Sequence, residues 1–362
     1  MKYEFLIVGQ GITGSVLATQ LEKLTKTFKI VDDFNKNTSS RVAAGIMHPM
    51  SLKRVNLSWN GKDFYDFSDD FYKKFDSLNK TKFYKSCSMI RVFNSYQEQN
   101  NWIGRCSDIK LKGIIDLNHQ KIDSINDAFG SGEVLKSNHL NVNFFLKYLK
   151  NKYETRNILK KEKFNHLKIK LENNMFYYGD DSFENIIMCD GSSSLKNPIF
   201  DYLPMIPNKG EIMNIFSDVL PKKIINCGVF CLPIKNKIFT VGSTYSNEDS
   251  KRHITNNAKN YLLKKLSKII NIDDISIVDQ SFGFRPTTPD RKPFIGEHPL
   301  IKNIYTLNGM GSKALLMAPL LAKELLDHIF NSKSISPLVD IKRYSDKIKS
   351  DNKAFAKSIM GQ

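Results

Sequence analysis

Short apolar runs alternate with glycine-rich or polar turns in the first part of the chain. Residues 3–8 (YEFLIV) are apolar and β-prone, residues 9–14 (GQGITG) hold spaced glycines, and Leu17, Leu21 and Leu24 then recur at helical spacing. A second apolar run, residues 28–31, ends at Asp32. The pattern predicts a strand, a tight glycine turn, a helix and a second strand.

Two later segments have the spacing of amphipathic helices. Residues 62–80 carry an aromatic stripe with charges between its members, and we expect this stripe to pack in a core rather than to stack bases. Residues 139–152 predict a second helix. The side chains expected to point inward are Phe64, Phe67, Phe71 and Phe75 in the first helix and Phe144, Phe145, Tyr148 and Leu149 in the second.

The rest of the chain is predicted to be richer in strands. A strand over residues 185–189 ends at Asp190 and Gly191. Residues 201–283 are mostly β-like, with helical character at 256–270, and a loop rich in proline and charge follows Gly283. A strand over 303–307, a glycine turn and a helix over 314–330 come next.

The first glycine turn has the features of a dinucleotide-binding site. Gly9 permits the tight turn, Gly11 lets the backbone approach a pyrophosphate, and Gly14 lets the helix pack closely on the strand. The amides and the dipole at the helix N-terminus favour a bound phosphate. Asp32, at the end of the second strand, suits a ribose hydroxyl and repels a 2′-phosphate.

Length and composition indicate a protein with two domains. The chain has 362 residues, is 41% hydrophobic and contains no run of about 18 apolar residues, so no membrane span is expected. Its five cysteines show no CxxC spacing, and we therefore expect reduced thiols, no metal site and a cytoplasmic location.

The net charge of +17 leaves two interpretations open. A basic protein can bind nucleic acid or another anionic partner. However, only nine of the 54 basic residues are arginine, and the lysines are spread along the chain, as on an ordinary solvated surface. In either case the positive charge favours an anionic substrate.

A nucleotide site at the start and a glycine turn near the end, separated by a β-rich insert, predict an α/β fold with a discontinuous Rossmann-like cofactor domain. The inserted substrate domain is expected to be an antiparallel β-sheet with helices (α+β). The expected bounds are 1–80, 139–200 and 284–345 for the cofactor domain, 81–138 and 201–283 for the substrate domain, and 346–362 for a basic C-terminal tail.

Several segments together resemble the D-amino-acid oxidase and glycine oxidase superfamily of FAD-dependent oxidoreductases, nearly from end to end. They are residues 9–32, the small-residue loop 39–46 (SSRVAAGI), the strand ending at Asp190 and Gly191, residues 203–210, residues 283–296 (GFRPTTPDRKPFIG), residues 309–312, residues 318–319 and residues 341–344. The segment 283–296 is the most specific of them. Asp190 departs from the family, which usually has a small residue before this glycine.

The resemblance implies FAD, bound without a covalent link because no cysteine follows residue 231 to form the cysteinyl-flavin bond of the sarcosine oxidases. Small residues at 43–45 would lie against the flavin ring, and glycines at 309 and 311 would aim amides at its N1 and C2 carbonyl. The implied cofactor-binding residues are Gly9, Gly11, Ile12, Thr13, Gly14, Asp32, Asp33, Arg41, Ala43, Ala44, Gly45, Gly191, Gly309, Gly311, Ser312, Lys313 and Ala314.

The reaction that the resemblance implies is hydride transfer from the α-carbon of an amine to flavin N5. Arg285 is expected to pair with the substrate carboxylate, and the alternative is a structural ion pair with a neighbour such as Asp290. His48 is the second candidate catalytic residue. It could tune the flavin, contact the substrate or fill the turn before Pro49.

Two branches of the superfamily fit the sequence. Glycine oxidases carry a second arginine where this chain has Ser312, and some have a tyrosine where it has Phe230. Residues 311–315 (GSKAL) are closer to the oxidase that removes a carboxymethyl group from the tRNA wobble uridine, although Ala314 departs from it. The expected substrate is therefore a small amine or amino acid, with tRNA as the alternative. A third possibility is a flavoprotein that binds FAD without turnover.

Overall fold

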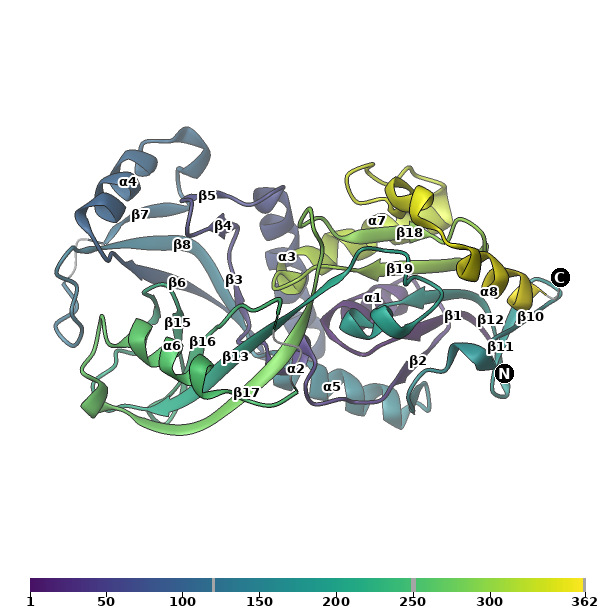
Figure 1. Ribbon diagram of the computed structural model, residues 1–362, viewed down its shortest axis with the longest axis horizontal. Coiled ribbons are helices and arrows are strands. Elements are labelled where there is room, and N and C mark those ends of the chain that lie inside the picture. The colour runs from purple at the N-terminus through teal and green to yellow at the C-terminus, as the bar shows by residue number, and fades with distance from the viewer. Residues whose placement is uncertain (119–120, 249–251, 361–362) are drawn as a thin grey trace. The chain divides into compact units, whose positions relative to one another are not determined.

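The computed structural model of the protein describes residues 1–118, 121–248 and 252–360 (Figure 1). The chain divides into two units. Unit 1 comprises Met1–Arg41, Val142–Asn208 and Phe284–Gln362, and unit 2 comprises Val42–Asn141 and Lys209–Gly283. Each unit is therefore assembled from separate stretches of the chain.

The unit boundaries depart most from the expected domain bounds at two places. Residues 42–80 belong to unit 2, where α3 (Gly61–Asn79) packs against β6 (Tyr84–Val92). The expected basic tail contains a helix, α8 (Ser350–Met360), which packs against β10 (Lys170–Glu172) of unit 1. The functional division of the chain at residues 80 and 345 stays a prediction.

A largely parallel sheet forms the centre of unit 1. Its described strands are β1 (Lys2–Val8), β2 (Phe28–Asp32), β9 (Leu159–Lys161), β10, β11 (Met175–Tyr178), β12 (Asp181–Met188), β18 (Phe294–Glu297) and β19 (Ile304–Asn308). β1 lies between β2 and β12, and β9 and β19 extend the sheet on either side, all in parallel register. β18 pairs with β19 in antiparallel register, and β10 and β11 continue from β12 in the same way. The predicted parallel α/β fold is confirmed.

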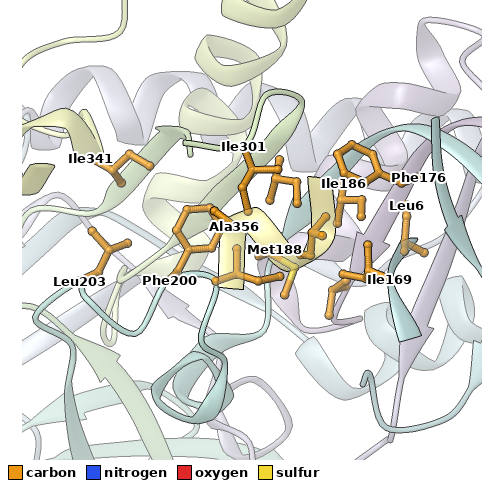
Figure 2. Close-up of a cluster of buried hydrophobic side chains, with 14 of the residues drawn as sticks. Leu6, Ile169, Phe176, Ile186, Met188, Phe200, Leu203, Ile301, Ile341 and Ala356 are labelled. Carbon is orange, nitrogen blue, oxygen red and sulfur yellow. The ribbon is translucent and has the colours of Figure 1, made fainter. Parts of the chain in front are cut away.

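Both faces of this sheet are covered, which explains why its central strands are almost continuously apolar. On one face Leu6 packs with Ile186, Met188 and residues from the C-terminal part of the chain, including Ala356 (Figure 2). On the other face Phe5 contacts Phe330 edge-on. Because successive side chains of a strand alternate in direction, β1 supplies both layers.

Three helices of unit 1 were predicted from the sequence, and two residues expected on their buried faces are exposed. The predicted helices are α1 (Ile12–Lys23), α5 (Val142–Thr155) and α7 (Ala314–Asn331). The structure adds α8 and the short α2 (Ser39–Val42), which spans the boundary between the units in the chain. α1 packs against α5 and α7. Leu17 and Leu21 are buried, but Leu24 follows the end of α1 and is exposed. In α5 Phe145 and Leu149 are buried as expected, whereas Phe144 is 59% exposed because the buried stripe runs through positions one residue away.

A second, mainly antiparallel sheet forms unit 2. Its described strands are β3 (Ile46–Met47), β6, β7 (Ile115–Asn118), β8 (Ser131–Leu140), β13 (Ile206–Phe216), β14 (Ile224–Asn226), β15 (Phe230–Lys235), β16 (Ile238–Gly242) and β17 (Ser276–Thr287). The order is β17-β13-β16-β15-β14-β6-β8-β3, with β7 also on β8, and β14 pairs with β6 in parallel. A separate pair, β4 (Met50–Ser51) and β5 (Asn56–Leu57), is antiparallel. The predicted second sheet is confirmed.

Helices α3, α4 (Tyr96–Cys106) and α6 (Asn256–Leu266) complete unit 2. The Ser95 hydroxyl caps α4 by accepting a hydrogen bond from the Glu98 amide, and Thr255 caps α6 in the same way. In α3 the aromatic stripe is a core face: Phe64 and Phe75 are buried, while Phe67 and Phe71 at its margins are half-buried.

The loop expected directly after Gly283 begins later than predicted. β17 continues through Arg285 and Pro286 to Thr287, because its pairing with β13 carries the strand across the boundary between the units. Among the helices that the structure describes, none is long and apolar enough to cross a lipid bilayer.

Candidate active site

The turn between β1 and α1 requires glycine at two positions. Gly9 has a φ of +105°, and a Cβ there would lie 2.5 Å from the carbonyl oxygen of Cys189, just after β12. A Cβ on Gly14 would collide with the carbonyl oxygen of Gly9. Only backbone therefore separates the start of α1 from the carboxyl ends of β1 and β12.

The start of α1 has no capping side chain from its own N-cap residue, which is Gly11. The Ile12 amide instead donates a hydrogen bond to the hydroxyl of Ser40 at 3.1 Å. Ser40 belongs to the short α2, which follows β2 in the chain, so two segments expected at the cofactor meet here. The amides and the positive end of the helix dipole at this point suit a phosphate.

Asp32 links the same turn to the carboxyl end of β2. Its Oδ2 accepts a hydrogen bond from the Gln10 amide at 2.6 Å, and its Oδ1 accepts one from the Phe34 amide at 2.6 Å. Arg41 forms an ion pair with this carboxylate at 3.3 Å. The structure thus brings together Asp32 and Arg41, two of the residues that the sequence predicts at the cofactor.

Asn308 connects the carboxyl ends of β12 and β19. Its Nδ2 donates to Oδ1 of Asp190 at 3.1 Å and to the carbonyl oxygen of Gly191 at 3.0 Å. Its Oδ1 accepts from the Gly309 amide at 2.8 Å. Burial raises the pKa of Asp190 to about 7, although hydrogen bonds from Asn197 and Asn308 oppose the shift.

The second glycine turn lies beside the first. Gly309 and Gly311 both have a positive φ, of +78° and +57°. The Gly311 amide donates to the carbonyl oxygen of Pro286 at 2.8 Å, and the Thr13 hydroxyl lies 3.8 Å from the sulfur of Met310. The start of α1, the turn 309–311 and the end of β17 are therefore neighbours within unit 1.

The turn 309–311 leads directly into α7. Lys313 is the N-cap residue of this helix, Ala314 is its first residue, and Ser312 is exposed. Burial and, to a smaller extent, the charge of Arg291 lower the pKa of Lys313 to about 8. An amine at this position would place a titratable positive charge beside any ligand of the turn.

Arg285 is held by a buried amide. Its Nη1 donates to Oδ1 of Asn208 at 2.6 Å, and Asn208 is fully buried while Arg285 is half-buried. Asp290, named as an example of an alternative partner for Arg285, forms an ion pair with Arg343 at 3.5 Å, and the substrate-binding role of Arg285 stays a prediction. Pro286 follows Arg285 directly in the chain. Because the carbonyl oxygen of Pro286 accepts the hydrogen bond from the Gly311 amide, Arg285 is held near the second glycine turn.

Unit 2 carries the small-residue loop 43–45. Gly45 has a φ of +84°, and the carbonyl oxygen of Ala44 accepts a hydrogen bond from Nε2 of His139 at 3.1 Å. Burial lowers the pKa of His139 to about 4, so its imidazole is neutral at pH 7 and carries its proton on Nε2. Ala43 precedes these residues in the same loop.

Two other expected site residues make local turns. The Nδ1 atom of His48 accepts a hydrogen bond from the Met50 amide at 3.3 Å, across Pro49. Asp33 accepts one from the Asn35 amide at 3.0 Å. Roles for His48 in chemistry and for Asp33 in cofactor binding stay predictions.

Four residues near these segments escaped the sequence analysis: Ser40, His139, Asn208 and Asn308. Asn308 had a local signal, since it directly precedes a glycine turn at the end of a predicted strand. Ser40 and Asn208 lie in the segments 39–46 and 203–210 that carry the family resemblance, but their contacts, like that of His139, are with residues far away in the chain that only the fold brings close.

The carboxyl edge of the unit 1 sheet fits a dinucleotide. Dinucleotides bind at this edge in open α/β sheets, where the order of the strands reverses. Here that point lies at β1, between β2 and β12. Three features lie there: a glycine turn that has no room for a Cβ, the start of α1, which has no side-chain cap from its own N-cap residue, and the carboxylate of Asp32.

Comparisons with known proteins agree with this geometry. A family model described as FAD dependent oxidoreductase matches residues 4–328. The glycine oxidase of Bacillus subtilis is 23% identical over 363 residues, which cover 91% of this chain and 93% of that protein. The crystal structure of iminodiacetate oxidase from Chelativorans sp. BNC1 has a TM-score of 0.77 and 16% identity, covering 94% of this chain and 98% of that one.

Other relatives match over shorter stretches. The bifunctional protein MnmC of Aromatoleum aromaticum, named for the biosynthesis of 5-methylaminomethyl-2-thiouridine in tRNA, is 25% identical over 149 residues. These residues cover 35% of this chain and 23% of that protein. The match to several other relatives is also partial, because this chain spans less than two fifths of their length.

Proposed function

Because the chain belongs to the family of FAD-dependent oxidoreductases, we propose that it oxidises a C–N bond of an amino acid or another amine that bears a carboxylate. The observation that carries this proposal is the position of Arg285. Its half-buried guanidinium is oriented by Asn208 and tied through Pro286 to the turn at Gly311. A planar guanidinium held in this way suits a carboxylate, which it can bind through two parallel hydrogen bonds.

The residues of unit 1 divide the remaining tasks. The start of α1 would hold the pyrophosphate of FAD, Asp32 a ribose hydroxyl, and the amides of the turn 309–311 the flavin. Bound FAD supplies the acceptor for a hydride from the substrate's α-carbon. Arg285 would hold the carboxylate so that this α-carbon is presented in a fixed orientation. The substrate amine loses its proton and becomes an imine, which water hydrolyses.

Relatives named for similar substrates support the proposal. Glycine and iminodiacetate both carry an amine and a carboxylate, and the enzymes named for them resemble this chain over more than nine tenths of its length. We also propose that FAD is bound without a covalent link. Acid precipitation should then release all of the flavin into the supernatant, and flavin that stays with the pellet would contradict this.

The direct test is anaerobic bleaching of the flavin absorbance on addition of glycine, sarcosine and proline together. Bleaching would support a small amino acid as substrate, and single compounds could then be compared. If the flavin stays oxidised with every carboxylate-bearing amine but is reduced by dithionite, the proposed activity is wrong.

Substitution of Arg285 tests its role. Arg285→Lys keeps the charge but loses the planar fork, so we expect KM for the substrate to rise about tenfold or more while FAD stays bound. Arg291→Lys makes the same chemical change in the neighbouring exposed loop and should leave KM unchanged. Equal kinetics for Arg285→Lys and the unsubstituted enzyme would remove Arg285 from the substrate site.

A second candidate is the removal of a carboxymethyl group from modified tRNA, which breaks the same kind of bond in a much larger substrate. The net charge of +17 and the match to MnmC favour it. Under the same anaerobic conditions, tRNA that carries the carboxymethylaminomethyl group should bleach the flavin and unmodified tRNA should not. If free glycine bleaches the flavin and the modified tRNA does not, this second candidate is excluded.

A further inference from the structure

A cavity of about 430 Å³ lies wholly within unit 2 and contains none of the residues assigned to the cofactor or the substrate. Its lining comes from residues 52–55, β6 and the residues just after it, α4, the segment from Asn226 to Gly228, and α6 with the residues that follow it. The lining residues are Leu52, Lys53, Val55, Arg91, Phe93, Asn94, Glu98, Asn101, Trp102, Asn226, Cys227, Gly228, Tyr261, Lys265 and Lys268.

The charges around this cavity are strongly unbalanced. Among the residues that the structure describes, four cations line it, namely Lys53, Arg91, Lys265 and Lys268, against the single carboxylate of Glu98. Such a concave cationic surface concentrates anions. It is large enough for a small organic ligand rather than for a single ion.

The one carboxylate is already engaged. Oε2 of Glu98 accepts hydrogen bonds from Nη2 of Arg91 at 3.1 Å and from the amide and Nδ2 of Asn94, at 3.0 Å and 3.1 Å. Desolvation alone would raise the pKa of Glu98, but these bonds and the charges of Arg91 and Lys268 lower it overall. Glu98 is therefore ionised at neutral pH and is held by Arg91 and Asn94.

Arg91 lines the cavity and is positioned to contact a ligand there. It is 9% exposed, and Oδ1 of Asn226 accepts a hydrogen bond from its Nη1 at 2.5 Å. Asn226 and Glu98 together use two of the five N–H groups of the guanidinium, so it has further donors for a phosphate oxygen. A buried arginine that two partners hold in this way is a pre-oriented donor.

Aromatic and amide groups complete the lining. Tyr261 is 44% exposed, and Nζ of Lys265 lies 5.6 Å from the centre of its ring. Phe93 and Trp102 in the lining are buried, and three asparagines offer both donors and acceptors. An exposed aromatic ring beside phosphate-binding cations is the combination that nucleotides use, through stacking and charge together.

We propose that this pocket of unit 2 binds a mononucleotide, with its phosphate held by Arg91, Lys265 and Lys268 and its base stacked on Tyr261. The proposal does not depend on the proposed oxidase activity, because the pocket shares no residue with that site.

The test uses the FAD-loaded protein, so that the dinucleotide site is filled. Isothermal titration with AMP, adenosine and inorganic phosphate should give saturable binding of AMP and at least tenfold weaker binding of the other two. The flavin absorbance is followed in parallel to confirm that FAD is not displaced. Phosphate binding as tight as AMP, or no AMP binding at all, would overturn the proposal.

Matched variants locate the binding. The double variant Lys265→Gln with Lys268→Gln should raise the Kd for AMP about tenfold or more, and Tyr261→Ala should raise it by a similar factor. Lys259→Gln with Lys264→Gln removes the same charge from α6 outside the lining and should leave Kd unchanged. Equal weakening by both double variants would mean non-specific attraction and would reject the site.

A final comparison separates a mononucleotide from a nucleic acid. Unmodified tRNA should not compete with AMP for the pocket at 150 mM salt. If tRNA binds and displaces AMP, and if the double variant Lys265→Gln with Lys268→Gln weakens tRNA binding, the pocket serves a polynucleotide instead and the proposal is wrong.

Discussion

Gly14 shows how closely a single residue can be constrained at this site. Its Cα lies so near the preceding turn that an added methyl group would collide with the carbonyl oxygen of Gly9. That oxygen belongs to backbone between a buried strand and a buried helix, so it cannot move aside as the end of a flexible side chain would. The constraint exists whether or not a cofactor is bound.

The variant Gly14→Ala should therefore lose stability and cofactor together. We expect a loss of about 1–3 kcal/mol in the free energy of unfolding, as for other overpacked sites, and a lower ratio of bound flavin to protein. Denaturant unfolding and the absorbance ratio of the purified protein measure these two quantities.

A control for this variant is Gly104→Ala in α4, where an added Cβ would meet no atom within 4 Å. This change should raise stability by about 0.5–1 kcal/mol through helix propensity. Loss of stability in both variants would show that the effect at Gly14 is not steric.

Asp190 should make the stability of unit 1 depend on pH. Its pKa is about 7 in the folded protein, against about 3.9 in an unfolded chain. Between these values the folded state binds the extra proton, so the stability that Asp190 contributes is full below pH 4 and is lost as pH rises to 7. Asp190→Asn is neutral throughout and should reduce this slope.

Urea unfolding at pH 5 and pH 8 tests this expectation, with the exposed Asp180→Asn as a matched control. The difference in unfolding free energy between the two pH values should shrink for Asp190→Asn and stay unchanged for Asp180→Asn. An unchanged slope in the first variant would assign the pH dependence to other groups.

At the scale of elements, α8 illustrates what composition can hide. The segment 346–362 was expected to be a basic C-terminal tail, but Asn352, Ala356 and Ile359 recur at helical spacing and are buried. The Nδ2 atom of Asn352 donates to Oδ1 of Asp201 at 2.6 Å. The helix is thus part of the unit 1 core shown in Figure 2.

Truncating a side chain in this helix should consequently destabilise unit 1. Ile359→Ala removes a side chain that is 5% exposed and should lower the free energy of unfolding by about 2 kcal/mol or more. Lys357→Ala, on the exposed face two residues away, should change it by less than about 0.5 kcal/mol. Equal effects on chemical denaturation would mean that the helix does not contribute to the core.

Elements with a strong local pattern could be predicted from the sequence. The βαβ unit at the start and the helix at 314–330 were found because strand, glycine turn and helix spacing each leave a signal within a few residues. The expectation that Phe144 points inward was wrong. Phe144 and Phe145 are adjacent, so the apolar face of the helix could be centred on either of them, and the sequence does not decide between the two. The extension of β17 to Thr287 was missed because it depends on β13, which is distant in the chain.

The candidate site divides in the same way. Gly9, Gly14 and Asp32 could be placed from spacing alone, and the structure brings them to one edge of the sheet. Asn208, in contrast, meets Arg285 only through the pairing of two strands, and no local pattern identifies it.

At the scale of the whole molecule, cofactor binding should couple to stability. A ligand that binds only the folded protein stabilises it by about 2.7 kcal/mol at a concentration 100 times its Kd. Removal of FAD should therefore lower Tm, and added FAD should restore it in a concentration-dependent manner. Thermal scans with and without FAD check this, and a Tm that is independent of FAD would contradict binding to the native state.

The interleaved order of the two units has a consequence for synthesis on the ribosome. Unit 2 ends at Gly283, so all of its segments have been translated before β18, β19 and α7 of unit 1 exist. The apolar β1 must wait for β12, which lies some 180 residues later and emerges on the order of ten seconds or more after it. Because the turn at Gly309 and Gly311 follows all of unit 2 in the chain, the nascent chain can complete the proposed flavin contact only after unit 2 has been translated. Until β12 has been translated, β1 therefore has only β2 as a neighbouring strand among the pairs described.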